Sequence, residues 1–242
     1  MTEYCGDDAL GYRRERTRLV PGAGLALDAR YRLAHLPLVA PDHPRVIPEQ
    51  AGTPYRRGLH PPVRSVVLPV PAGALEASPA YRALDAALRT APFAGKIAWD
   101  LLPRRRDRLH ATLCGLGDAP APDPGSLAGL GPLRVALRGL FSGTVNVGRL
   151  YLKVYPERRG GANAAHAIQA ALGRPASDLY LVGIWNLVDD LDPAEAAALA
   201  GLLDAWWDRP ILRLTVDALR LLSSRDDLAL DATVEAMLPL TA

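Results

Sequence analysis

Apolar and polar positions alternate along several short segments from residue 64 onward, which predicts strands separated by amphipathic helices. A helix is expected from Ser78, a favoured N-cap followed by proline, to about residue 89. Another begins at Asp192, which with Glu195 has the spacing of a capping box. A third covers residues 163–172. Extended segments are expected at 65–70, 96–102, 109–113, 133–138, 147–155, 179–188, 211–222 and 228–240, with a turn at 223–227.

The order of these elements contains an internal duplication. The strand at 65–70, its helix and the strand at 109–113 have counterparts at 149–155, 163–172 and 180–188. We therefore expect an α+β fold with two lobes, each a strand–helix–strand unit, whose last strands lie side by side around a central cleft.

Residues 1–62 differ from the remainder of the chain. They contain eight of the 22 prolines, and no long helical or strand period continues between them. We interpret this segment as an N-terminal arm or cap on a main domain at 63–242. No pattern assigns a role to its histidines, His35, His43 and His60.

Composition narrows the class of protein. The chain has 242 residues, is 49% hydrophobic and 22% charged, and carries a net charge of +2, too small to indicate nucleic-acid or membrane binding by itself. Cys5 and Cys114 are far apart and lack metal-ligand spacing. No signal peptide or membrane-length apolar segment is visible, so we expect a cytoplasmic protein without membrane contact. The oligomeric state stays open.

Candidate chemistry lies on the segment at 107–114. Alternation places Leu109, Ala111 and Leu113 on one face of the strand and His110, Thr112 and Cys114 on the other. An imidazole and a hydroxyl then point into the same cleft, close to Arg104, one of three consecutive arginines suited to phosphate. The alternative is a chance His-x-Thr whose histidine is an ordinary strand residue.

A second face combines cations with aromatic rings. Arg149, Tyr151, Lys153 and Tyr155 alternate along one strand, an arrangement that suits a phosphate flanked by a nucleobase. The alternative is a solvated sheet face with extended side chains. His166 lies beside the buried stripe of its helix and is expected at the surface.

The Leu-His-Ala-Thr-Leu strand at 109–113, the duplicated layout and the two closing strands resemble the two-histidine (2H) phosphoesterase superfamily, which includes RNA ligase-like proteins and 2′,3′-cyclic phosphodiesterases. The resemblance covers about residues 64–240. It implies that each half contributes a His-x-Thr or His-x-Ser strand, that one histidine is a general base and the other a general acid, and that the hydroxyls hold phosphate. It implies neither metal nor other cofactor.

Only the first motif matches, at His110 and Thr112. At the second, Asn186 stands where histidine is expected and Val188 where the hydroxyl is expected. An amide does not titrate, so Asn186 can orient a ligand but cannot transfer a proton. Tyr151, His166 and Asp189 are the nearest substitutes along the sequence.

Three hypotheses follow: a divergent hydrolase acting on a phosphodiester of a nucleotide or RNA end, a degenerate member that binds such a ligand without turnover, or a scaffold.

Overall fold

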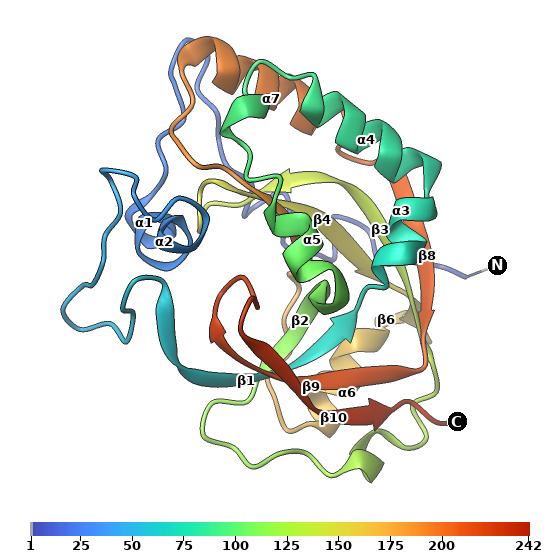
Figure 1. Ribbon diagram of the computed structural model, residues 1–242. Helices are drawn as coiled ribbons and strands as arrows, with labels where there is room; N and C mark the ends of the chain where they lie inside the picture. Colours follow the sequence, from blue (N-terminus) through green and yellow to red (C-terminus); the bar gives the residue numbers. More distant parts are fainter. Residues whose placement is uncertain (1) are drawn as a thin grey trace.

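The computed structural model describes residues 2–242 and is built on one curled antiparallel sheet of eight strands (Figure 1). Their order across the sheet is β10-β9-β1-β2-β7-β4-β3-β8. The strands are β1 (Leu59–Pro69), β2 (His110–Gly115), β3 (Leu133–Ser142), β4 (Arg149–Pro156), β7 (Leu181–Asn186), β8 (Pro210–Val216), β9 (Ala218–Asp226) and β10 (Ala232–Pro239). A separate two-stranded ribbon pairs β5 (Arg158–Arg159) with β6 (Ala162–Asn163).

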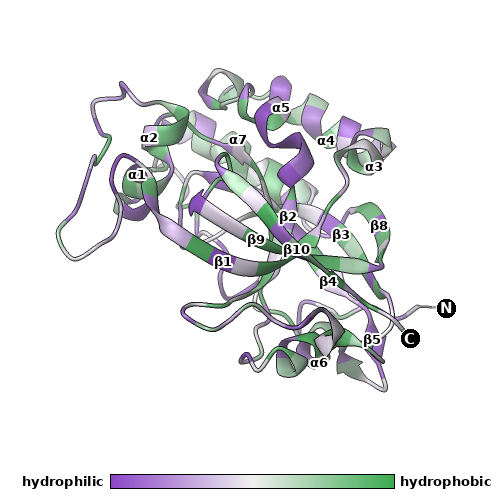
Figure 2. Ribbon diagram, turned by 60° about the horizontal axis from the view of Figure 1, so that its bottom comes forward, coloured by the Kyte–Doolittle hydropathy of each residue, from purple (hydrophilic) through white to green (hydrophobic). Residues whose placement is uncertain are grey.

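The sheet has two halves that meet at β2 and β7, where Ala111 pairs with Val182. The half formed by β10, β9, β1 and β2 carries the first strand–helix–strand unit, and the half formed by β7, β4, β3 and β8 carries the second. The α+β class and the adjacency of the two last strands are therefore confirmed. Strand β1 carries both hydrophilic and hydrophobic residues (Figure 2): Val66–Leu68, near its end, are buried, whereas the residues before them are exposed or half-buried apart from His60.

Seven α-helices accompany the sheet in the described residues: α1 (Ala29–Ala34), α2 (Leu36–Val39), α3 (Ala72–Ala77), α4 (Pro79–Arg89), α5 (Leu101–Arg105), α6 (Ala164–Ala171) and α7 (Pro193–Ala205). The capping predictions are confirmed. The Ser78 hydroxyl accepts the Tyr81 N–H at 3.2 Å, and Asp192 and Glu195 form a reciprocal capping box. In Figure 1, α4 and α7 lie above the sheet, while α1 and α2 lie at one side of it.

Two predictions of extended structure are wrong. Residues 96–102, expected as a strand, run from the last residue of a 3-10 turn at Ala94–Lys96 into the first two residues of α5. The segment at 211–222 is not one strand: the chain changes partners at Asp217, so β8 pairs with β3 at one edge of the sheet while β9 pairs with β1 in the other half. The final turn accordingly falls at 227–231, later than the predicted 223–227.

The N-terminal arm is an integral part of the core. Leu10, Tyr12, Leu27 and Tyr31 are buried, and Tyr12 donates its hydroxyl to the carbonyl of Val154 on β4 at 2.5 Å. The arm ends earlier than its prolines indicate, because β1 already begins at Leu59. No helix within residues 2–242 has the length and apolar character needed to cross a bilayer.

Candidate active site

A cavity of about 380 Å³ opens on the polar face of the first half of the sheet. Its volume lies at the lower end of the ~300–1,000 Å³ range of small-molecule sites. The wall is formed by strands β1, β2 and β9, the β9–β10 hairpin, the start of β4 and the arm. Its lining residues are Pro54, Tyr55, His60, Val63, Ser65, His110, Thr112, Asn146, Arg149, Leu222, Ser224, Asp226, Asp227 and Ala229. His110 and Thr112 thus share one cavity, as their alternation predicts.

A backbone carbonyl fixes the tautomer of His110. Its Nδ1 lies 2.6 Å from the carbonyl oxygen of Arg108, which only accepts hydrogen bonds, so Nδ1 carries the proton and Nε2 carries the lone pair. Burial, and then the nearby Arg105 and Arg149, lower the pKa of His110 to about 4. At neutral pH the ring is therefore uncharged. Thr112, two residues further along β2, exposes its hydroxyl to the same cavity.

Arg149 brings a cation to this cavity from the first position of β4. Its Nη1 donates to the backbone carbonyl of Asp227 at 2.9 Å, while its Nε has no hydrogen-bond partner within the part of the chain that the structure describes. The guanidinium lies against Gly183 on β7, where any Cβ would overlap it. The missing side chain at Gly183 is what lets Arg149 reach the cavity.

None of the three arginines at 104–106 lines the cavity, and Arg105, not the expected Arg104, is the one whose charge lowers the pKa of His110. Arg104 is exposed on α5, 3.9 Å from Asp100, and does not line the cavity. Arg105 points inward instead: it is 1% exposed and donates to the carbonyls of Leu228 at 2.5 Å and Gly183 at 3.0 Å. Burial lowers its pKa to about 9, which still leaves it charged at neutral pH.

His60 is the second histidine of the cavity, and its two ring nitrogens both face acceptors. Nδ1 lies 2.7 Å from the carbonyl of Pro61, and Nε2 lies 3.2 Å from Oδ1 of Asp227. A neutral imidazole has only one N–H, so this environment favours the imidazolium. The pKa of His60 is raised, chiefly by Asp227. The surroundings of His60 therefore favour its protonated form, whereas those of His110 oppose it.

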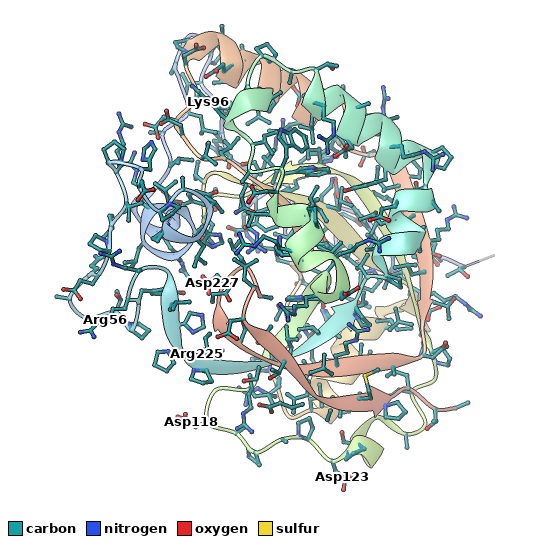
Figure 3. The ribbon with its side chains drawn as sticks, in the orientation of Figure 1. Arg56, Lys96, Asp118, Asp123, Arg225 and Asp227 are labelled. Carbon is teal, nitrogen blue, oxygen red and sulfur yellow. The ribbon has the colours of Figure 1, made fainter. Side chains whose placement is uncertain are left out.

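Asp227 lies at the end of the β9–β10 hairpin (Figure 3). Tyr55 donates its hydroxyl to Oδ2 at 2.9 Å, and His35 Nε2 lies 3.6 Å from the same oxygen. Although burial opposes ionisation, contacts with His35, His60 and Tyr55 hold the pKa of Asp227 far below its usual range. His35 itself is completely buried, which lowers its pKa to about 4.

Asp226 fixes the backbone of this hairpin. Its carboxylate accepts the N–H groups of Leu228 at 2.8 Å, Leu230 at 3.0 Å and Asp231 at 2.7 Å. Asp226 is 2% exposed, so these are charge-assisted bonds shielded from water. The turn that presents Asp227 to His60 is consequently rigid.

Three of the predicted ligand-binding residues on β4 do not line the cavity. The arm covers this part of the sheet: Lys153 is 0% exposed, with Nζ 3.4 Å from the centre of the Trp207 ring, and burial lowers its pKa to about 8. Tyr155 donates its hydroxyl to Asp7 at 2.6 Å. Tyr151 is buried behind Arg149, with that cation 5.4 Å from its ring centre. The alternative of a solvated face is wrong as well.

Asn186 is also outside the cavity wall. It is fully buried at the end of β7, and its Nδ2 donates to the Tyr31 hydroxyl at 3.3 Å. Val188 follows the end of β7. The proposed substitutes for the missing acid are occupied elsewhere: Asp189 contacts His43 at 3.2 Å, and His166 contacts Asp178 at 2.7 Å.

Sequence patterns do not point to His60, Arg105, Asp226 or Asp227. His60 precedes two prolines, which conceal the start of β1 because proline cannot donate a ladder hydrogen bond. The acidic pair at 226–227 has the composition of an ordinary turn. One available signal is the helical phase of residues 101–105, in which only one arginine of the run faces inward.

Comparisons with known proteins add little to this geometry. No protein-family model matches the chain, and no curated protein does. Among solved structures, the chain is similar to the crystal structure of TT0787 of Thermus thermophilus, with 16% identity, a TM-score of 0.39, and coverage of 74% of this chain and 97% of that one. A likeness of that size leaves the function to be argued from the cavity. Within residues 2–242, no group of three or more His, Cys, Asp or Glu side chains has a metal-binding arrangement.

Proposed function

We propose that this protein is a divergent phosphoesterase of the two-histidine type that hydrolyses a phosphodiester or cyclic phosphate of a nucleotide or RNA end without a metal ion. The observation that carries the proposal is that neutral His110, whose proton is on Nδ1 and whose lone pair is on Nε2, lines one small cavity together with Thr112 and Arg149. These are a base, a hydrogen-bond donor and a cation, the groups needed to attack a bound phosphodiester.

Each group has a separate task in this proposal. His110 Nε2 takes the proton of an attacking water molecule, as a neutral imidazole does in general-base catalysis. Thr112 donates its hydroxyl to a non-bridging phosphate oxygen. Arg149 neutralises the charge that accumulates on the other oxygens, and its contact with the Asp227 carbonyl fixes its position beforehand.

Binding without turnover is the second candidate function. It is favoured by Asn186, which occupies the second motif position without a titratable group and is buried against Tyr31. In that case the cavity would retain affinity for a phosphodiester through Arg149 and Thr112 while hydrolysing it no faster than a protein that lacks His110.

The test uses purified full-length protein, 2′,3′-cyclic nucleotides and short RNA with a cyclic phosphate end, in buffer containing a metal chelator. We expect hydrolysis, and a loss of about 10²- to 10⁴-fold in kcat/KM for His110→Ala. His166→Ala is the matched control, because His166 is a partly exposed histidine bound to Asp178 outside the cavity. Saturable binding without turnover would support the second candidate, and neither binding nor turnover would refute both.

A further inference from the structure

A second cavity, of about 700 Å³, adjoins the candidate active site and has no part in the mechanism above. Its lining comes from the arm and the first residues of β1, between positions 48 and 61, together with Arg225 on β9. The two cavities share Pro54 and His60 in their walls. All of its lining residues except Arg225 precede the segment on which the family resemblance rests, so the resemblance implies no role for them.

The charge of this second cavity is positive. Three arginines line it, Arg56, Arg57 and Arg225, against a single carboxylate, that of Glu49. Arg56 faces Glu49 with 3.7 Å between Nε and Oε2, and both side chains are so exposed that the pair contributes little. Arg57 and Arg225 are exposed and have no ion-pair partner within residues 2–242. A concave wall with two unpaired cations attracts an anionic ligand.

Arg57 occupies a backbone position that arginine does not favour. Arg56 and Leu59 exchange backbone hydrogen bonds of 2.7 and 3.0 Å, so Arg57 and Gly58 are the two central residues of a tight turn. Both have a positive φ, 48° and 79°, the combination for which Asn-Gly is the preferred sequence. Gly58 meets this requirement, and a Cβ there would collide with Leu38. The geometry of the turn does not account for an arginine at position 57.

Contacts between the arm and the β9–β10 hairpin hold the walls of this cavity in place. Tyr55 donates its hydroxyl to Oδ2 of Asp227 at 2.9 Å, and the N–H of Arg57 donates to the carbonyl of Pro48 at 2.6 Å. Arg225 lies two residues before Asp227 (Figure 3). The arginines from the arm and from β9 therefore belong to segments that are joined before a ligand arrives, which reduces the cost of ordering them on binding.

The chemistry of this cavity fits the phosphate group of a nucleotide. Guanidinium groups bind phosphate oxygens through paired N–H donors, a geometry that lysine does not provide. Pro48, Pro54 and Pro61 add rigid apolar surface beside the arginines, as small-molecule sites commonly do. The volume of about 700 Å³ also lies within the ~300–1,000 Å³ range of such sites.

We propose that this arginine pocket, the cavity lined by Arg56, Arg57 and Arg225, is a second phosphate-binding site for a nucleotide, separate from the site at His110. The phosphate belongs either to a free nucleotide or to a strand that also occupies the adjoining cavity. The walls shared at Pro54 and His60 place the two cavities next to each other, as a strand would require. Binding in the arginine pocket needs no hydrolysis, so its test is independent of the proposed function.

The test measures binding of single-stranded hexaadenylate RNA and of adenosine 5′-monophosphate to the full-length protein at several salt concentrations. Arg57→Asn is the most informative variant, because Asn-Gly suits the turn better than Arg-Gly. Its melting temperature should equal or exceed that of the wild type. Its affinity for RNA should nevertheless fall about 10-fold, the effect of losing one charge-assisted hydrogen bond. The slope of log K against log salt should decrease by about 0.7, the value of one phosphate contact on a single strand.

Arg225→Ala should show the same losses from the other side of the sequence. Arg104→Ala is the matched control, since Arg104 is an exposed arginine on α5 that lines neither cavity. If the pocket takes a free nucleotide, Arg57→Asn and Arg225→Ala should weaken the binding of adenosine 5′-monophosphate as well as that of RNA. If it takes part of a strand that occupies both cavities, they should weaken the binding of RNA alone.

Three results would overturn the inference while leaving hydrolysis at His110 untouched. The first is unchanged affinity of Arg57→Asn and Arg225→Ala for both ligands, or a loss no larger than that of Arg104→Ala. The second is a lower melting temperature of Arg57→Asn, which would assign Arg57 to the stability of its turn. The third is the absence of saturable binding of either ligand by the wild type.

Discussion

Acid should destabilise this protein through His35, which is completely buried beside Asp227. Its pKa is about 4 in the folded protein against an ordinary value of 6.5, because burial disfavours the charged ring. The unfolded chain therefore binds a proton that the folded chain refuses between these two values, and stability falls as the pH falls through this window. Well above pH 6.5 neither state is protonated, so the full stability is present.

The size of the effect follows from the two pKa values. One pKa unit corresponds to about 1.4 kcal/mol, and at about pH 5 the unfolded histidine is almost fully protonated while the folded one is almost fully neutral. His35 alone should then lower the free energy of unfolding by about 2 kcal/mol between about pH 7.5 and 5. This is a large part of the ~5–15 kcal/mol that stabilises an ordinary domain.

His35→Gln removes the titration but keeps an amide able to reach Asp227. Urea unfolding followed by tryptophan fluorescence at the two pH values gives the free energy of unfolding of each protein. We expect the pH dependence of the variant to be smaller than that of the wild type by about 2 kcal/mol. His43→Gln is a suitable control, since that histidine pairs with Asp189 near the surface. An identical pH dependence in the wild type and His35→Gln would refute the argument that His35 is buried in its neutral form.

Two further predictions concern the walls of the cavity. Gly183→Ala places a methyl group where the Arg149 guanidinium lies. We expect kcat/KM for a phosphodiester to fall about 10-fold or more, the effect of losing one charge-assisted hydrogen bond, with little change in melting temperature. Gly201→Ala, on α7 with open space around it, is the control. Asp226→Asn removes the charge that holds three N–H groups of the hairpin, so urea titrations should show a loss of about 2–4 kcal/mol in unfolding free energy, and NMR should show a lower pKa for His60. Asp231→Asn, an exposed neighbour, should change neither, and an unaltered Asp226→Asn would contradict the role of the hairpin.

The parts of this fold that the sequence predicts correctly depend on residues close together in the chain. Caps at Ser78 and Asp192 depend on residues three positions apart, so the sequence alone locates both helices. The alternation that places His110 beside Thr112 is local as well. The repeat of strand–helix–strand units was sufficient to predict that β2 and β7 are neighbours.

The remainder of the site depends on contacts between distant segments. His60 meets Asp227 from the far end of the chain, and neither position has a distinctive neighbourhood in sequence. Lys153 alternates with aromatic residues as a ligand-binding face would, but Trp207 and Asp7 converge on it from the two ends of the chain. The alternation of polar and apolar residues along a strand does not show which face of the sheet another segment will cover.

The placement of β8 and β9 in different halves of the sheet has a consequence for how the protein folds during synthesis. The ribosome completes β1 and β2 early, but their half of the sheet also needs β9 and β10, the last strands to be made. Until β9 is made, one edge of β1 is unpaired and His60 lacks its ion-pair partner Asp227. Contacts such as Trp207 with Asp7 impose the same delay on the other half. So high a share of long-range contacts predicts slow folding, with an exposed strand edge on the nascent chain as the form most prone to aggregate.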